Sequence, residues 1–122
     1  MQKRKNQNLT HGEEQIMQIL WSLGSGNVNS IIDKMEEPKP AYTTVATFMK
    51  ILEEKEFVGR KLAGRSYTYY PEIAKEDYAQ RVLRSTVADY FNSSIVELVS
   101  FYNEMQPLSQ EEKEALQALL SK

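Results

Sequence analysis

The fold of this chain is decided by the stretch from Tyr42 to Pro71, YTTVATFMKILEEKEFVGRKLAGRSYTYYP. Its first half carries apolar residues at the i, i+3, i+4, i+7 spacing of a helix with one buried face: Val45, Phe48, Met49 and Leu52. Beyond Glu56 the residues are mostly strand formers, and Ala63-Gly64 stands where a hairpin needs a tight turn. The stretch therefore predicts a helix over about 42–55 and strands over about 57–62 and 66–70.

A helix that starts with a capping box is predicted ahead of this stretch. Thr10-His11-Gly12-Glu13 has the S/T-x-x-E form, in which the first and the last side chain each cap the other's backbone N–H. Apolar residues follow at helical spacing: Ile16, Ile19, Leu20 and Leu23. Gly24 and Gly26 are expected to end this helix by supplying positive φ angles.

A second short helix is predicted before Tyr42. Its N-cap is expected near Asn29 or Ser30, and Pro38 and Pro40 are expected to end it. Its apolar residues fall at the same spacing: Val28, Ile31, Ile32 and Met35. Three short helices with matching apolar faces can bury one shared core, which none of them could bury alone.

The chain beyond Pro71 is predicted to be helical, with helices over about 74–91 and 94–105 and a last one capped by Ser109. The 94–105 helix is apolar on nearly every side, so it needs cover from more than one direction. A second copy of the chain is the economical cover, and packing back onto the N-terminal half is the alternative. The residues expected at a dimer contact are apolar or aromatic: Val87, Phe91, Ile95, Leu98, Val99, Tyr102, Leu116, Leu119 and Leu120.

The predicted fold class is mainly α with a small β hairpin. Residues 1–71 are predicted to form a winged helix-turn-helix DNA-binding domain, with the 42–55 helix as recognition helix and the hairpin as wing. Residues 72–122 are predicted to form a helical dimerisation domain. A twofold dimer would present two recognition helices about one DNA turn apart, to a pseudo-palindromic operator in double-stranded DNA.

Short polar side chains cover the face of the 42–55 helix opposite its apolar stripe. Threonine hydroxyls can bond base edges or phosphates, and a threonine methyl can pack on a thymine methyl. Glu53 and Glu54 would repel DNA, so only the first half of the helix can enter a groove. Basic residues around the hairpin tip suit phosphate contacts, and a tip arginine entering the minor groove is the alternative. The candidate DNA contacts are Tyr42, Thr43, Thr44, Thr47, Lys50, Arg60, Lys61 and Arg65.

Charge alone does not identify a DNA-binding protein here. The net charge is −2, but residues 1–71 hold ten Lys/Arg against eight Asp/Glu (+2), and residues 72–122 hold five against nine (−4). The modest basic excess therefore lies in the half that carries the hairpin. The N-terminal MQKRKNQN is polar and basic, and we expect a frayed arm rather than a signal peptide.

No catalytic or metal-binding constellation stands out. The single histidine, His11, falls in a helix cap, and the chain has no cysteine and no glycine-rich phosphate loop. No apolar run approaches the ~20 residues that span a bilayer. We therefore expect no enzyme, catalytic residue, cofactor, metal or membrane insertion, and a cytoplasmic location. The rival function is a winged-helix protein–protein interaction module, in which the basic hairpin is an ordinary solvated surface.

Several motifs occur in order along the chain: Leu9-Thr10, Glu14, Ile19-Leu20-Trp21, Tyr42-Thr43-Thr44-Val45, Thr47, Leu52, Lys55, Phe57-Val58, Gly64-Arg65, Tyr67, Tyr69-Tyr70-Pro71, Phe91-Asn92-Ser93-Ser94 and Leu108-Ser109. In this order they resemble the BlaI/MecI-type penicillinase-repressor family of bacterial winged-helix regulators. The resemblance covers nearly the whole chain, and its YTTV…GR-x-Y-x-Y portion is fairly specific.

The resemblance implies a homodimeric repressor on a palindromic operator, with Thr43, Thr44 and Thr47 as recognition-helix contacts and Arg65 as a wing contact. Many members of that family are inactivated when a membrane sensor-protease triggers cleavage in the C-terminal part. The corresponding segment here is roughly Val99–Tyr102, in which Ser100-Phe101 is the nearest match to the family's asparagine-phenylalanine step.

The chain departs from the family's pattern at two positions. Ala46 stands where a basic residue is frequent, and Glu56 stands where a glycine is frequent. Because one of these positions lies within the recognition helix, the operator sequence of the family does not transfer to this chain.

Overall fold

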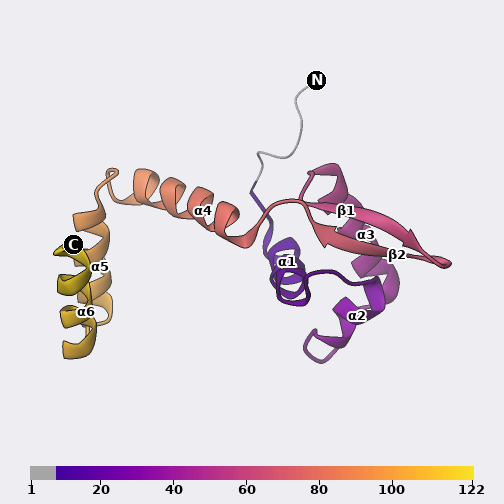
Figure 1. Ribbon diagram of the computed structural model, residues 1–122, viewed down its shortest axis with the longest axis horizontal. Coiled ribbons are helices and arrows are strands. Elements are labelled where there is room, and N and C mark those ends of the chain that lie inside the picture. The colour runs from indigo at the N-terminus through magenta and orange to yellow at the C-terminus, as the bar shows by residue number, and fades with distance from the viewer. Residues whose placement is uncertain (1–7) are drawn as a thin grey trace, which may run out of the picture. The chain divides into compact units, whose positions relative to one another are not determined.

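The computed structural model describes residues 8–122, so the expected basic arm of residues 1–7 lies outside the described residues. The elements run in the order α1 (His11–Leu23), α2 (Val28–Asp33), α3 (Tyr42–Glu54), β1 (Val58–Ala63), β2 (Ser66–Pro71), α4 (Lys75–Tyr90), α5 (Ile95–Met105) and α6 (Gln110–Leu120) (Figure 1). This confirms the fold class, mainly α with one antiparallel hairpin. The described residues form two compact units, 8–80 and 81–122. The predicted functional division after Pro71 stays a prediction.

α1 begins with the predicted capping box. The Thr10 hydroxyl accepts from the Glu13 N–H at 3.3 Å, and the Glu13 carboxylate accepts from the Thr10 N–H at 2.9 Å. Gly24 ends the helix with φ 84°, as predicted, and its N–H donates to the Leu20 carbonyl. Both ends of α1 are therefore determined by residues within the helix or next to it.

The prediction for Gly26 is wrong. Among the described glycines only Gly24 and Gly64 have positive φ, and Gly26 lies in an isolated β-bridge with Tyr69 of β2. The Gly26 N–H donates to the Tyr69 carbonyl at 3.0 Å, and the Tyr69 N–H donates to the Gly26 carbonyl at 2.9 Å. The extended segment after α1 thus pairs with the hairpin. Its backbone N–H and C=O groups are satisfied by β2 and not by the last turn of α1.

α2 begins earlier than predicted. Its N-cap is Asn27, whereas the sequence predicts a cap near Asn29 or Ser30. The Asn27 side chain accepts from the Ser30 N–H at 2.8 Å, and the Ser30 hydroxyl accepts from the Asn27 N–H at 3.0 Å. Ser30 is therefore the third residue of the helix and completes a reciprocal cap, which is why the helix starts upstream of it.

α2 ends at Asp33, ahead of the prolines that were expected to end it. The Lys39 ammonium group donates to three backbone carbonyls at this end of the helix: those of Ile32, Asp33 and Met35. A lysine close to a helix C-terminus satisfies carbonyls that have no intrahelical partner and interacts favourably with the helix dipole. Pro38 and Pro40 lie beyond this cap and only prevent the helix from continuing.

The three N-terminal helices share one core with the hairpin, as predicted. Its fully buried large side chains come from α1, α2, α3 and the residue before β1: Ile16, Met17, Leu20, Ile31, Val45, Met49, Leu52 and Phe57. Phe48, predicted to face inward, is half-buried and packs against the edge of this core. Figure 1 shows these helices gathered beside the two strands.

The start of α4 belongs to the first unit. Tyr78 is buried, and its ring centroid lies 6.0 Å from that of Trp21 and 5.5 Å from that of Phe57. The Tyr78 hydroxyl accepts from the Leu9 N–H at 2.8 Å, and the Trp21 indole N–H donates to the Ile73 carbonyl at 2.8 Å. A buried tyrosine with a partnered hydroxyl thus ties the segment after the hairpin to the core.

A buried ion pair joins the start of α1 to the end of α3. Lys55 Nζ lies 2.7 Å from Glu13 Oε1, and the two side chains are only 8% and 4% exposed. Burial raises the pKa of Glu13, but the hydrogen bond from Lys55, the Thr10 N–H and the charge of Lys55 together outweigh it. The pKa of Glu13 therefore lies below its ordinary value. The carboxylate that caps α1 is also the counter-ion of Lys55.

Glu56 ends α3 in a left-handed conformation, with φ 66°. A side chain disfavours this conformation because Cβ approaches the following carbonyl oxygen, at a cost of roughly 1–2 kcal/mol. The structure thereby accounts for the glycine that is frequent at this position in the family which the sequence resembles. We expect Glu56→Gly to raise the free energy of unfolding by about 0.5–1 kcal/mol, after allowance for glycine's greater freedom in the unfolded chain.

Urea unfolding at a fixed protein concentration measures the effect of Glu56→Gly. Glu54→Gly is the matched control, because Glu54 lies in the last turn of α3, where glycine should lower the free energy of unfolding by about 1 kcal/mol. Equal losses at positions 54 and 56 would contradict the conformational explanation.

The second unit, residues 81–122, has no fully buried side chain. Asn92 and Ser93, both with positive φ (53° and 60°), join α4 to α5, and Ser109 caps α6 as predicted. No residue of α5 or α6 is buried. Within residues 8–122 no helix is both long and apolar enough to cross a membrane, and no cluster of three or more acidic, histidine or cysteine residues could hold a metal ion.

Candidate nucleic-acid interface

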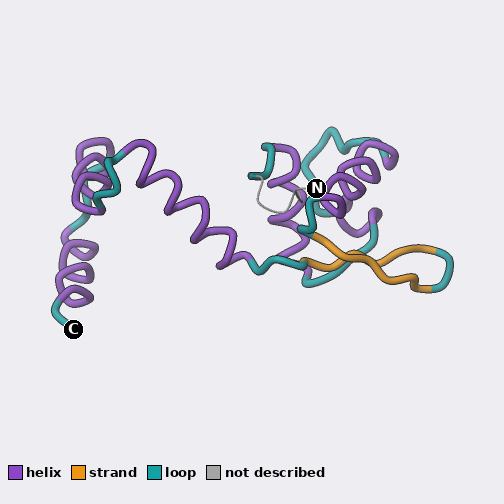
Figure 2. The backbone as a smooth tube through the Cα atoms, turned by 90° about the horizontal axis from the view of Figure 1, so that it is seen from above, coloured by secondary structure: helices purple, strands orange, loops and turns teal. Residues whose placement is uncertain are grey.

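The hairpin extends beyond the helices as a two-stranded ribbon (Figure 2). β1 and β2 pair in antiparallel register, from Val58 with Pro71 to Ala63 with Ser66. Gly64 and Arg65 form the turn, one residue later than the predicted Ala63-Gly64, because Ala63 still pairs with Ser66 as the last residue of β1. Gly64 has φ 66°. Positive φ at the first of two turn residues suits the twist of the strands. The exposed side chain of Arg65 therefore lies at the far end of the hairpin.

The alternation of side chains along the strands gives the hairpin two faces. Val58 is buried and marks the face that turns toward the core, and Arg60 and Leu62 continue this face outward, with Tyr67 paired to Leu62. Lys61 lies on the opposite face. The two neighbouring cations that the sequence groups together, Arg60 and Lys61, therefore point in different directions.

The predicted contacts on α3 are all exposed: Tyr42, Thr43, Thr44, Thr47 and Lys50. Thr47 Oγ1 donates to the Thr43 carbonyl at 2.9 Å. That bond uses the hydroxyl proton and leaves the hydroxyl lone pairs and the methyl group for other contacts. The bond therefore fixes the direction in which the exposed Thr47 methyl group points.

The N-terminus of α3 has no side-chain cap. Its N-cap is Ala41, whereas a side chain caps each of α1, α2, α5 and α6: Thr10, Asn27, Ser94 and Ser109. The N–H groups of Thr44 and Val45 bond the Ala41 carbonyl, so those of Tyr42 and Thr43 have no intrahelical partner. Such N–H groups, at the positive end of the helix dipole, favour an anion such as a phosphate.

A pocket of about 210 Å³ lies between the start of α3 and the hairpin. Tyr42 and Ala46 of α3 line it together with Arg65 and Tyr67 of the hairpin. The structure thus brings the predicted contacts Tyr42 and Arg65 to one place.

Arg60 differs from the other cations of the hairpin. Its Nε lies 3.3 Å from Glu53 Oε2, and its guanidinium carbon lies 4.1 Å from the centroid of the Tyr67 ring. Within residues 8–122, Lys61 and Arg65 have no ion-pair partner. Lys61 and Arg65 therefore offer their charges to an outside anion, while Arg60 is held by side chains of its own chain.

The residues predicted for a dimer contact lie at the surface of the second unit. The exposed ones are Ile95, Val99, Tyr102, Leu119 and Leu120, and the half-buried ones are Val87, Phe91, Leu98 and Leu116. Most of the other large apolar side chains that are exposed within residues 8–122 lie in this unit too. In residues 8–80 such side chains are confined to the start of α3 and the hairpin: Tyr42, Leu62 and Tyr67.

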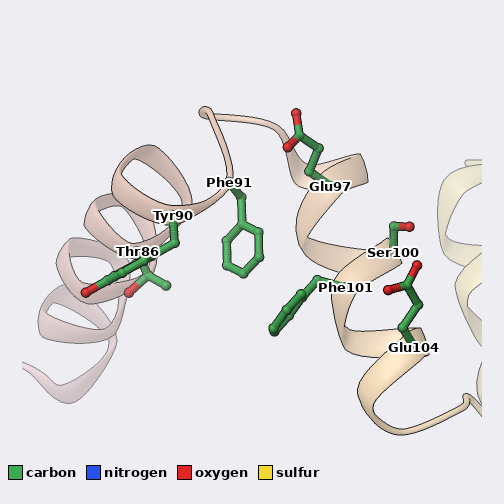
Figure 3. A pocket seen from close by; sticks show the side chains of 7 residues that line it. All are labelled: Thr86, Tyr90, Phe91, Glu97, Ser100, Phe101 and Glu104. Atoms are coloured by element: carbon green, nitrogen blue, oxygen red, sulfur yellow. The ribbon is translucent and has the colours of Figure 1, made fainter.

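Ser100 and Phe101, the predicted cleavage segment, lie in the middle of α5 and are exposed. The Phe101 ring packs on Phe91, with centroids 5.3 Å apart. Both rings line an open pocket of about 650 Å³, together with Thr86, Tyr90, Glu97, Ser100 and Glu104. Figure 3 shows these side chains. The predicted segment is thus accessible to solvent but helical.

Comparison with known proteins identifies the family of the chain. Residues 9–122 match the penicillinase repressor family. The chain belongs to this family. It is a family of transcriptional repressors, which is not a class of enzymes. This family member is 25% identical over 119 residues to the methicillin resistance regulatory protein MecI of Staphylococcus aureus (strain N315), covering 97% of each chain. It is 25% identical over 118 residues to the penicillinase repressor of Bacillus licheniformis, covering 96% of this chain and 92% of that one.

Solved structures of BlaI resemble the first unit of this repressor-family protein. The solution structure of the DNA-binding domain of the repressor BlaI superimposes with a TM-score of 0.53 and 25% identity, covering 64% of this chain and 94% of that one. The monomeric form of Bacillus licheniformis BlaI, solved in complex with the blaP half-operator, gives a TM-score of 0.50 and 25% identity, covering 59% and 89%. The predicted winged-helix fold is therefore confirmed.

Sequence reasoning missed two features of this surface. The uncapped start of α3 has a signal in the sequence, because alanine stands at position 41 where Ser, Thr, Asn or Asp would cap. The pairing of Arg60 with Glu53 and Tyr67 has a weaker signal. Strand alternation places Arg60 on the same face as buried Val58, but the partner on α3 depends on how the hairpin lies.

Proposed function

We propose that this protein is a DNA-binding transcriptional repressor that acts in the cytoplasm as a homodimer on a pseudo-palindromic operator. The observation that carries the proposal is the exposed, polar and uncapped start of α3 beside a hairpin with unpaired cations, in a chain of the penicillinase repressor family. Thr43, Thr44 and Thr47 would read base edges in the major groove. Lys50, Lys61 and Arg65 would contact phosphates.

The free N–H groups at the start of α3 support a phosphate contact beside Tyr42. A helix N-terminus without its own capping side chain leaves donors that an incoming phosphate can accept from. Tyr42 is 52% exposed at this position, and Arg65 shares its pocket. The backbone phosphate next to the groove would therefore be held from the helix and from the wing together.

The exposed apolar surface of the second unit supports the dimer. Monomeric proteins in water rarely expose contiguous apolar patches larger than a few hundred Å². In α5 the side chains of Ile95, Val99 and Tyr102 recur at the spacing of one helix face, and no residue of this helix is buried. A second copy would cover this face. The relative solved with the blaP half-operator is a monomeric form, in line with one half-site per copy.

Relief of repression by proteolysis at Ser100-Phe101 is part of the same proposal. A protease binds its substrate in an extended conformation, so α5 has to unfold locally before cleavage. Because α5 buries no residue within its own chain, local unfolding of α5 in a monomer costs little free energy. Cleavage there would remove the proposed dimer face and lower operator affinity.

The test is selection of bound duplexes from random DNA with the full chain, followed by titration of the selected duplex at several salt concentrations. We expect the selected DNA sequence to be a pseudo-palindrome. For each phosphate contact, the association constant should fall by about 0.9 logarithmic units when the salt concentration rises tenfold. Arg65→Ala should weaken binding to every sequence and flatten this slope by about 1. Absence of binding to any duplex, even at low salt, would favour the protein–protein interaction module.

Thr47 provides the matched test of base reading. Thr47→Val keeps the methyl group and removes the hydroxyl, whereas Thr47→Ser keeps the hydroxyl that bonds the Thr43 carbonyl and removes the methyl. If the methyl group packs on a thymine, Thr47→Ser alone should relax specificity at one base pair, by roughly fourfold for one buried methyl. Loss of specificity in Thr47→Val alone would assign the contact to the hydroxyl.

A further inference from the structure

Arg60 sits at the junction of three elements. It belongs to β1, its ion-pair partner Glu53 lies in the last turn of α3, and the ring beneath its guanidinium belongs to Tyr67 of β2. The Nε–Oε2 distance is 3.3 Å, and the guanidinium carbon lies 4.1 Å from the ring centroid. One side chain therefore joins the proposed recognition helix to both strands of the wing.

The outer half of the wing has no buried side chain. Every residue from 60 to 67 is exposed, and the pocket of about 210 Å³ lies between Tyr67 and the start of α3. The last backbone connection between the hairpin and the helices within the described residues is the bridge of Gly26 to Tyr69. Outward from Tyr69, the bond of Arg60 to Glu53 is the one ion pair between the hairpin and α3 within residues 8–122.

The charge of Arg60 is also matched inside the chain. Glu53 is the acidic group nearest to it, and it lies on the half of α3 that would repel phosphate. An ion pair keeps both charges local, so Arg60 has less charge to offer to DNA than Lys61, which faces the other way and has no ion-pair partner within residues 8–122.

We propose that Arg60 is a positioning residue that sets the direction of the wing relative to α3, and not a phosphate contact. The proposal rests on the DNA-binding function proposed above. The sequence predicts Arg60 to be a DNA contact because it lies beside Lys61 in the basic hairpin, and the proposal gives Arg60 a different role. The phosphate-contacting cations of the hairpin are then Lys61 and Arg65, one on the outer face and one at the tip.

The first test needs no DNA. Backbone order parameters from 15N relaxation of the full chain report how rigidly the wing is held on the ps–ns timescale. Arg60→Ala should lower the order parameters of residues 61–67 toward the flexible range, below about 0.6, and Lys61→Ala should leave them unchanged. Order parameters in Arg60→Ala that equal those of the unsubstituted protein would overturn the proposal.

The second test is the salt dependence of affinity for the selected duplex. Arg60→Ala should weaken binding by about fivefold, the combined effect of one exposed cation–π contact and one surface ion pair, with the salt slope unchanged. Lys61→Ala should flatten the slope by about 1. A slope flattened by about 1 in Arg60→Ala would show a phosphate contact and overturn the proposal.

A double-substitution cycle completes the test. If Arg60 acts through Glu53, Arg60→Ala causes less loss of affinity in the Glu53→Gln background than in the unsubstituted chain. If Arg60 contacts phosphate instead, Arg60→Ala causes at least as large a loss in the Glu53→Gln background, which overturns the proposal. Should the unsubstituted chain bind no duplex at all, the proposed function fails, and the order parameters still decide whether Arg60 holds the wing.

Discussion

Val99→Glu is expected to separate the two copies of the chain and to lower affinity for a full operator by roughly 100-fold or more. Val99 is 39% exposed on α5, and it lies on the helix face formed with Ile95 and Tyr102. In a twofold dimer the substitution places an unpaired carboxylate from each copy in an apolar contact, where its desolvation is not compensated. The two recognition helices then bind as independent molecules, and the gain from joining two half-sites is lost.

Equilibrium sedimentation and titration of full and half operators measure this effect. Val99→Glu should sediment as a monomer and keep its affinity for a half-site, because the first unit is not altered. Val96→Glu is the matched control: Val96 is 73% exposed on the same helix but lies outside the predicted dimer face. If Val99→Glu still sediments as a dimer and binds the full operator normally, the proposed interface is wrong.

Lys55→Met is expected to lower the free energy of unfolding by about 3–5 kcal/mol. The substitution leaves the carboxylate of Glu13 buried at 4% exposure without its counter-ion, while the Thr10 N–H still donates to it. Glu13→Gln combined with Lys55→Met removes both charges and keeps a side-chain acceptor for the Thr10 N–H. The double variant should recover most of the lost stability, because replacing both partners of a buried ion pair destabilises a protein far less than removing one of them.

The same pair predicts how stability depends on pH. The pKa of Glu13 in the folded protein lies below its ordinary value, so its ionised form stabilises the fold. This contribution is fully present above the ordinary value of 4.5 and is lost as the pH falls through the lowered pKa. The difference in unfolding free energy between the unsubstituted chain and Glu13→Gln should therefore be constant near neutral pH and shrink in acid. Urea unfolding at fixed protein concentration from neutral pH down to about pH 3 measures it.

The local features of this chain were predictable because their signals lie within a few residues of one another. The capping box of α1, the positive φ of Gly24, the helix at 42–54 and the turn at Gly64 follow from short-range backbone chemistry. The shared core was predictable too, because apolar residues at helical spacing leave one face that only other helices can cover.

The predictions that failed concern residues whose partners are distant in the sequence or compete locally. Gly26 was expected to end a helix, but its backbone pairs with Tyr69, which periodicity cannot reveal. The N-cap of α2 was misplaced because Asn27, Asn29 and Ser30 all have capping side chains, and only Asn27 forms a reciprocal pair. The end of α2 was assigned to prolines, although the Lys39 ammonium reaches back to its carbonyls.

The sequence by itself determined the order of the elements, the polar start of α3, the position of the cations on the hairpin and the apolar character of the last helices. Only the tertiary structure decided which charges are free. Glu13 with Lys55 and Glu53 with Arg60 are pairs between elements, whose distances depend on how α3 lies against α1 and the hairpin. Electrostatic attraction falls with distance and is screened by water, so a charge acquires its role from the neighbour that the fold places beside it.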